Sequence, residues 1–129
     1  MPYDIYLAQH KDVFEKYDQK VTFLITPLTT ETRIKEINDA TTGFVYIVSS
    51  SATTGATESN YNEEFLSKVK SLGLTKPHQI GFGISTKEDV EKAWNFANGA
   101  IIGSAFLRVL ENSNGNLSES IKNYISELR

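Results

Sequence analysis

Short apolar runs alternate along the chain with segments whose apolar residues recur at helical spacing. The runs are rich in β-branched and aromatic residues, or hold glycine beside apolar residues, and they predict strands at 21–26, 44–48, 80–83 and 100–103. The amphipathic segments predict helices between these strands, as well as a helix at each end of the chain, over residues 3–17 and 117–128. The pattern therefore predicts regular alternation of strand and helix.

Polar residues and glycines indicate where several of these helices begin and end. Thr30 is suited to cap the helix after the first strand, and Gly43 is suited to end it. Ser85 and Glu88 have the spacing of a capping box at the start of a later helix. Trp94 lies on the apolar stripe of that helix, so we expect it to pack in the core.

Alternation with short connections favours parallel strands joined by right-handed crossovers, because parallel neighbours need a connection of helix length. The expected class is α/β, in one domain over residues 1–129. The nearly continuous apolar run at 44–48 predicts a sheet covered on both faces. Four strands are too few for an eight-stranded barrel, so an open sheet and half of a (β/α)8 barrel both remain possible.

Composition narrows the range of partners. The 129 residues are 40% hydrophobic and 22% charged with a net charge of −3, which predicts neither nucleic-acid nor membrane binding. There is no cysteine for disulfides, and no apolar run has the length of a membrane helix. The first residues lack the pattern of a secretory signal, so we expect a cytoplasmic protein.

Titratable residues give little sign of a metal or catalytic site. His10 and His78 are far apart and have no ligand-like spacing around them, so we expect no metal. The acidic pairs Glu63-Glu64 and Glu88-Asp89 lie near helix starts, where the helix dipole favours negative charge, and we interpret them as solvated.

One long polar connection, residues 49–60, follows the second predicted strand. Loops after strands often carry the chemistry of α/β proteins, and a long one can act as a lid. An ordinary surface loop is an equally good interpretation of its composition.

Two glycine-containing turns follow the third and fourth predicted strands. Gly81-Phe82-Gly83-Ile84-Ser85 and Gly103-Ser104-Ala105 both lead from a strand towards a helix start. Glycine lets a ligand approach the backbone, and amides at a helix start attract anions. Phosphate sites in (β/α) barrels are often built from two such consecutive loops and a short helix. The pair therefore predicts a phosphate site.

Five motifs together resemble the tryptophan synthase alpha subunits. In chain order they are Phe23-Leu24-Ile25-Thr26-Pro27, Gly43-Phe44-Val45-Tyr46-Ile47-Val48-Ser49, Thr54-Gly55-Ala56, Gly81-Phe82-Gly83-Ile84-Ser85 and Gly103-Ser104-Ala105. The similarity covers the whole chain and corresponds to the C-terminal half of the family, from its fourth helix to its eighth. It implies half of a TIM (β/α)8 barrel, with four parallel strands and flanking helices. Another phosphate-binding barrel of histidine or tryptophan biosynthesis fits less well, because it would not share the Tyr46 and Thr54-Gly55 motifs.

The resemblance also implies a reaction, a partner and roles for individual residues. The family cleaves indole-3-glycerol phosphate by retro-aldol chemistry to indole and glyceraldehyde 3-phosphate, and passes indole to a beta subunit that holds pyridoxal phosphate. No cofactor is expected in this chain itself. The substrate-binding residues carried over are Tyr46 and Phe82 at the indole, Thr54 in the lid, and Gly55, Gly83, Gly103 and Ser104 at the phosphate. By residue type alone, a mid-strand tyrosine such as Tyr46 is more often a core aromatic, and Phe82 also fits a core position.

No catalytic residue is expected in this chain. The family's acid/base glutamate and aspartate lie on and after its second strand, outside the region that this sequence resembles, and Thr54 would only support that aspartate. The first interpretation is therefore an enzyme fragment that binds a phosphate ester and is inactive by itself. The alternative is a non-catalytic assembly module, which self-associates through open sheet edges or pairs with another subunit.

Overall fold

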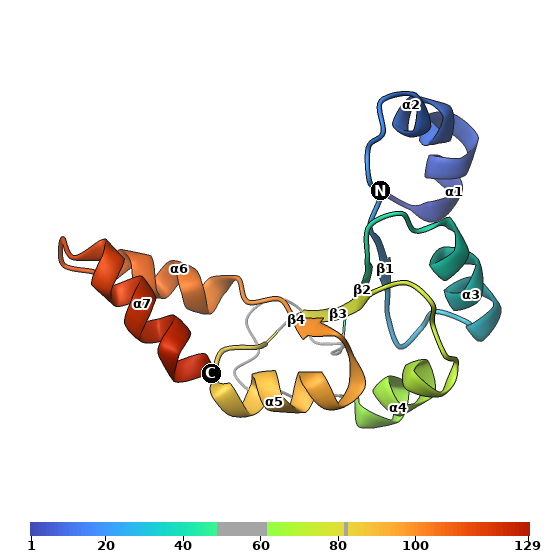
Figure 1. Cartoon of the computed structure of the whole chain (residues 1–129). Helices are drawn as coiled ribbons and strands as arrows, with labels where there is room; N and C mark the ends of the chain where they lie inside the picture. The colour runs from blue at the N-terminus through green and yellow to red at the C-terminus, as the bar shows by residue number, and fades with distance from the viewer. Residues whose placement is uncertain (49–61, 82) are drawn as a thin grey trace.

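The computed structural model of the chain describes residues 1–48, 62–81 and 83–129 (Figure 1). The predicted site residues Thr54, Gly55 and Phe82 lie outside this described part. The elements run in the order α1 (Tyr3–Ile5), η1 (Tyr6–His10, a π-helix), α2 (Lys11–Lys16), β1 (Phe23–Ile25), α3 (Glu31–Ala40), β2 (Val45–Val48), α4 (Glu63–Ser71), β3 (His78–Gly81), α5 (Lys87–Phe96), β4 (Gly99–Ala100), α6 (Ser104–Glu111) and α7 (Leu117–Leu128).

The described strands form one parallel sheet in the order β1-β2-β3-β4, so each strand lies beside its neighbour in sequence. This confirms the α/β prediction and gives the strand order of half a (β/α)8 barrel. Figure 1 shows α3, α4 and α5 along one side of the sheet, with α6 and α7 as a pair beyond β4.

The two faces of the sheet differ in burial. Phe23, Ile25, Val45, Ile47 and Ile80 share one face and are at most 1% exposed, packed against the apolar residues of α3, α4 and α5. On the other face, Leu24 of β1 is 52% exposed. The prediction of a sheet covered on both faces is therefore wrong for the described part of this chain. Apolar residues on the second face show that the face is suited to burial. They do not show that another part of the same chain buries it.

The first predicted helix, residues 3–17, contains a π-helical turn. The Lys11 amide donates to the Tyr6 carbonyl, five residues back, which widens the helix at this point. The buried Tyr6 ring meets Phe14 and Phe23 edge-to-face, at centroid distances of 5.5 and 5.2 Å. Aromatic packing thus joins the first helical segment to β1.

The helix caps were predicted with mixed success. Thr30 caps α3 as expected, since its side chain accepts a hydrogen bond from the Arg33 amide. Gly43 does not end this helix, which stops at Ala40 with Thr41 as its cap. The Gly43 amide instead donates to Val21 at 2.9 Å, and a β carbon here would approach the Thr22 hydroxyl to 2.8 Å. Glycine is therefore needed for close packing beside β1.

Two strands are shifted from their predicted positions. The third was expected at 80–83 but begins at His78, because polar residues His78 and Gln79 pair with Val45 and Tyr46 of β2. It ends before Gly83, whose φ of +75° is incompatible with a strand. The fourth is limited to Gly99–Ala100 instead of 100–103. The first shrinks to Phe23–Ile25.

Trp94 was predicted to lie in the core but is 55% exposed. The buried stripe of α5 runs through Val90 and Ala93. Trp94 follows Ala93 directly, and a single step along a helix turns the side chain about 100° away from its neighbour. The apolar stripe of this helix is thus narrower than its sequence indicated.

Candidate phosphate-binding site

The two predicted glycine turns follow neighbouring strands at the same edge of the sheet. Gly83 comes shortly after β3 and Gly103 shortly after β4, and β3 and β4 pair in parallel. In a parallel sheet the carboxyl ends of all strands meet at one edge, which is where ligands of α/β proteins bind. Thr54, Gly55 and Phe82, also predicted for this site, lie outside the described residues.

The turn after β3 exposes its backbone at Gly83. This glycine is exposed and adopts φ +75°, and a β carbon added to it would meet no atom of the described residues within 4 Å. No described residue therefore fills the space above this backbone, and the left-handed conformation favours glycine. A ligand can approach the main chain here.

The start of α5, however, is occupied by the chain's own carboxylate. Oδ2 of Asp89 accepts hydrogen bonds from the Ser85 and Thr86 amides, both at 3.0 Å, and the Thr86 hydroxyl accepts from the Asp89 amide. The capping box is thus Thr86 with Asp89, one residue later than the predicted Ser85 and Glu88. The expectation that these helix amides would point at a bound anion is wrong for α5.

Asp89 is also not the solvated residue that was predicted, since it is 7% exposed. Burial by itself raises the pKa of this carboxyl, but hydrogen bonds from Ser85 and Thr86 outweigh burial and lower the pKa below its ordinary value. The carboxylate is therefore charged at neutral pH, and its charge is satisfied by the turn.

The start of α6 is different. Its N-cap is Gly103, no side chain caps it within the described part of the chain, and its first turn has no acidic residue. The first backbone bond of the helix runs from the Leu107 amide to the Gly103 carbonyl, and Ser104 is exposed. Amides at an uncapped helix start carry partial positive charge and favour an anion. Of the two predicted anion sites, this is the one whose amides no described side chain occupies.

Tyr46 lies on the open face of the sheet and packs over β3. A β carbon on Gly81 would overlap the Tyr46 hydroxyl, so the ring lies directly against the backbone of that glycine. The side chain is half-buried, and this burial raises the pKa of the Tyr46 phenol. Tyr46 therefore belongs neither to the fully buried core nor to the solvent-exposed surface.

Tyr124 of α7 also contacts this region, although the sequence predicted only that residues 117–128 form an amphipathic helix. Its hydroxyl donates to the Ser85 carbonyl at 3.4 Å, and its ring lies 6.3 Å from that of Phe106 in α6. The only feature of the sequence that distinguishes Tyr124 is its phenol group among the aliphatic residues of this helix face. It does not specify which carbonyl the hydroxyl would reach.

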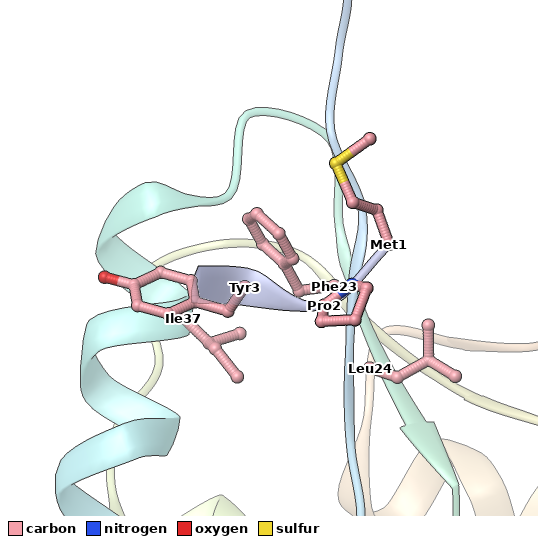
Figure 2. A pocket seen from close by; sticks show the side chains of 6 residues that line it. All are labelled: Met1, Pro2, Tyr3, Phe23, Leu24 and Ile37. Carbon is pink, nitrogen blue, oxygen red and sulfur yellow. The ribbon is translucent and has the colours of Figure 1, made fainter. Parts of the chain in front are cut away.

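A separate hollow of about 320 Å³ lies at the other end of the sheet, beside β1. Figure 2 shows Tyr3 and Phe23 close to Ile37, with Met1 and Leu24 on the other side of Pro2. The lining is apolar and holds none of the predicted phosphate-binding residues. In the described ranges, no group of three potential metal ligands occurs, and no helix is long and apolar enough to cross a membrane.

Comparison with known proteins supports the predicted resemblance. Residues 6–128 match the family described as tryptophan synthase alpha chain. The alpha chain of Flavobacterium johnsoniae is 40% identical over all of this chain, and that of Parabacteroides distasonis is 39% identical. The chain spans about half the length of the curated relatives it matches, 51% for both of these.

Solved structures of the same kind have a similar fold. The tryptophan synthase α2β2 complex from Pyrococcus furiosus matches with a TM-score of 0.77 and 31% identity, over 96% of this chain and 51% of that one. A mutant alpha-subunit from the same organism matches with a TM-score of 0.78 and 28% identity, over 99% and 51%. The four-stranded sheet is thus half of the alpha-subunit barrel, and the chain belongs to the tryptophan synthase alpha chain family.

Proposed function

We propose that this chain supplies the phosphate-binding half of a tryptophan synthase alpha subunit. In this proposal the start of α6 and the backbone at Gly83 hold the phosphate of indole-3-glycerol phosphate, with the Ser104 hydroxyl assisting. Tyr46 and Phe82 line the indole side, Gly55 helps to hold the phosphate, and Thr54 belongs to the lid. The single observation that carries the proposal is the start of α6 at Gly103 and Ser104, which no described side chain caps, one strand away from the exposed Gly83.

We infer further that these residues by themselves do not cleave the substrate. Retro-aldol cleavage needs one group to protonate the indole ring and another to take a proton from the glycerol hydroxyl. Glu88 and Asp89 are the described carboxylates nearest in sequence after the Gly83 turn. Glu88 is an exposed residue of the first turn of α5, and hydrogen bonds from the Ser85 and Thr86 amides already occupy Asp89. The resemblance implies that the family's acid/base carboxylates lie outside this chain, which spans about half the length of its relatives.

The remaining assignments follow the family. We propose a beta subunit as the partner of the complete alpha subunit, since one similar structure is an α2β2 complex. We propose that the chain holds no cofactor of its own, because pyridoxal phosphate belongs to that partner. The proposed location is the cytoplasm, where this biosynthetic reaction is expected.

The proposal is tested by giving α6 the same kind of carboxylate that already occupies α5. Ser104→Asp is expected to weaken binding of inorganic phosphate at least about tenfold, because two anions then compete for the same amides. The free energy of unfolding should stay constant or rise by about 0.5 kcal/mol, because the acidic residue favours the helix start. Phosphate titration by NMR and urea unfolding measure the two effects separately.

Ser104→Asn is the matched control, with almost the same shape and no charge. It should retain phosphate binding within about threefold, since the backbone donors remain. Equal binding by the wild type, Ser104→Asp and Ser104→Asn would contradict a site at α6, as would wild-type shifts that map far from Gly83 and Gly103.

A second candidate function is assembly of the half barrel with another copy of itself. The supporting observation is the open face of the sheet, where Leu24 is 52% exposed beside the apolar hollow at β1. Pairing of β1 with β4 of a second copy would cover both outer strands.

Light scattering of the 129-residue chain tests this assembly. A dimer that dissociates on Leu24→Lys is expected if the open face is the contact, since a buried unpaired charge is costly. Lys35→Glu, an exposed charge change on α3, is the control and should leave the mass unchanged. A monodisperse monomer would exclude self-association.

A further inference from the structure

Two different helices form hydrogen bonds with the backbone of Ser85, α5 with its amide and α7 with its carbonyl. Asp89 of α5 accepts from the Ser85 amide at 3.0 Å and from its hydroxyl at 3.4 Å. Tyr124 of α7 donates to the Ser85 carbonyl at 3.4 Å. The position of this residue, two places after Gly83, is therefore determined by contacts outside its own turn.

The same contacts connect the turn to the other half of the proposed site. Tyr124 lies against Phe106, with ring centroids 6.3 Å apart, and Phe106 is in the first turn of α6. The chain of contacts thus runs from Asp89 through Ser85 and Tyr124 to the helix that begins at Ser104. Because both glycine turns must face one phosphate, their relative position matters for binding.

We propose that Asp89 and Tyr124 are positioning residues for the phosphate site, which hold the Gly83 turn against the start of α6. This inference rests on the proposed function. It assigns to Asp89 a role opposite to the one its charge suggests, since a carboxylate near a phosphate should weaken binding by repulsion. Removal of Asp89 therefore separates positioning from simple electrostatics.

Glu88 provides the matched comparison. It is in the same first turn of α5, it is exposed, and hydrogen bonds to its own amide and to the Thr86 side chain lower its pKa. Unlike Asp89, it makes no hydrogen bond with Ser85 in the described part of the chain. Glu88→Ala removes one negative charge at the same helix start and leaves the Ser85 contacts in place.

The experiment is an NMR titration of the 129-residue chain with inorganic phosphate. Asp89→Ala is expected to bind about tenfold more weakly than the wild type, even though it is less negative, because the turn loses its fixed geometry. Glu88→Ala should bind equally well or up to about twofold more tightly, because repulsion falls. Asp89→Asn, which keeps an acceptor oxygen, should restore part of the loss, and Tyr124→Phe should weaken binding about threefold.

Amide exchange without phosphate gives an independent readout of the turn. The Ser85 and Thr86 amides should be protected in the wild type and partly protected in Asp89→Asn, but exposed in Asp89→Ala. If Asp89→Ala does not fold, phosphate binding by Tyr124→Phe and Asp89→Asn tests the inference instead. Tyr124→Phe removes only a hydroxyl group, and Asp89→Asn keeps an acceptor oxygen. Wild-type binding in all folded variants would overturn the inference alone. A wild type with no phosphate-dependent shifts would overturn the proposed function, and the inference with it.

Discussion

Gly81→Ala is expected to lower the free energy of unfolding by about 2–3 kcal/mol, a large effect for a single methyl group. The added carbon would overlap the hydroxyl end of Tyr46, so the ring must leave its position over β3. The ring is half-buried and packs on a strand in the middle of the sheet. Urea unfolding followed by circular dichroism measures the loss.

A double-mutant cycle identifies the cause. With Tyr46→Ala in the background, Gly81→Ala should cost less than about 0.5 kcal/mol, because the overlapping ring is gone. Gly99→Ala is the control within the same sheet, since a β carbon there would meet Gln79 only at an ordinary 3.8 Å. It is expected to change stability little. Equal costs at Gly81 with and without Tyr46 would show that the ring is not the reason.

The Gly81 variant also affects the proposed site. Tyr46 is assigned to the indole side of that site, and its position depends on a neighbouring residue without a side chain. The sequence indicated both residues, Tyr46 through the resemblance and Gly81 through its turn motif. It did not indicate that one makes room for the other, because Val48 is the direct register partner of Gly81. The contact is diagonal and appears only in the folded sheet.

The fold was predictable where a local rule decides the outcome. The apolar runs and the helical spacing predicted the order of strands and helices, and Thr30 predicted the start of α3. Both signals depend on only a few neighbouring residues. The start of β3 was not predictable in this way, since His78 and Gln79 are strand residues only by pairing with β2. Trp94 was misplaced because the packed width of α5 depends on its neighbours.

The site was predictable to the level of its loops. Both glycine turns follow neighbouring strands as expected. Their sequence motifs are similar, but the helix starts after them differ in whether a side chain caps them. Asp89 occupies the first and nothing caps the second among the described residues. Since Glu88 and Asp89 are adjacent carboxylates, the sequence could not indicate which one turns back to the amides. That choice depends on backbone geometry after Gly83.

Asn38 carries no signal in the sequence that would single it out, and its removal is the second large expected effect. It is 5% exposed in α3, and its Oδ1 accepts from the Thr75 and Lys76 amides at 3.1 and 3.0 Å. Its Nδ2 donates to the Thr75 hydroxyl at 3.0 Å. One amide side chain therefore fixes the segment that leads into β3, the strand that precedes the Gly83 turn.

Asn38→Leu keeps the approximate size of the side chain and removes these hydrogen bonds, so the Thr75 and Lys76 amides lose their protein acceptor. We expect a loss of about 2–3 kcal/mol in urea unfolding, because partly buried donors without an acceptor cost more than a net hydrogen bond contributes. Thr75→Val removes only the bond to Nδ2 and should cost about 1 kcal/mol. If both variants cost the same, the two amide bonds contribute nothing, and the segment before β3 must be held by its pairing with β2. A difference of the expected size would instead show that α3 positions β3 through a single buried side chain, before any ligand binds at the far end of that strand.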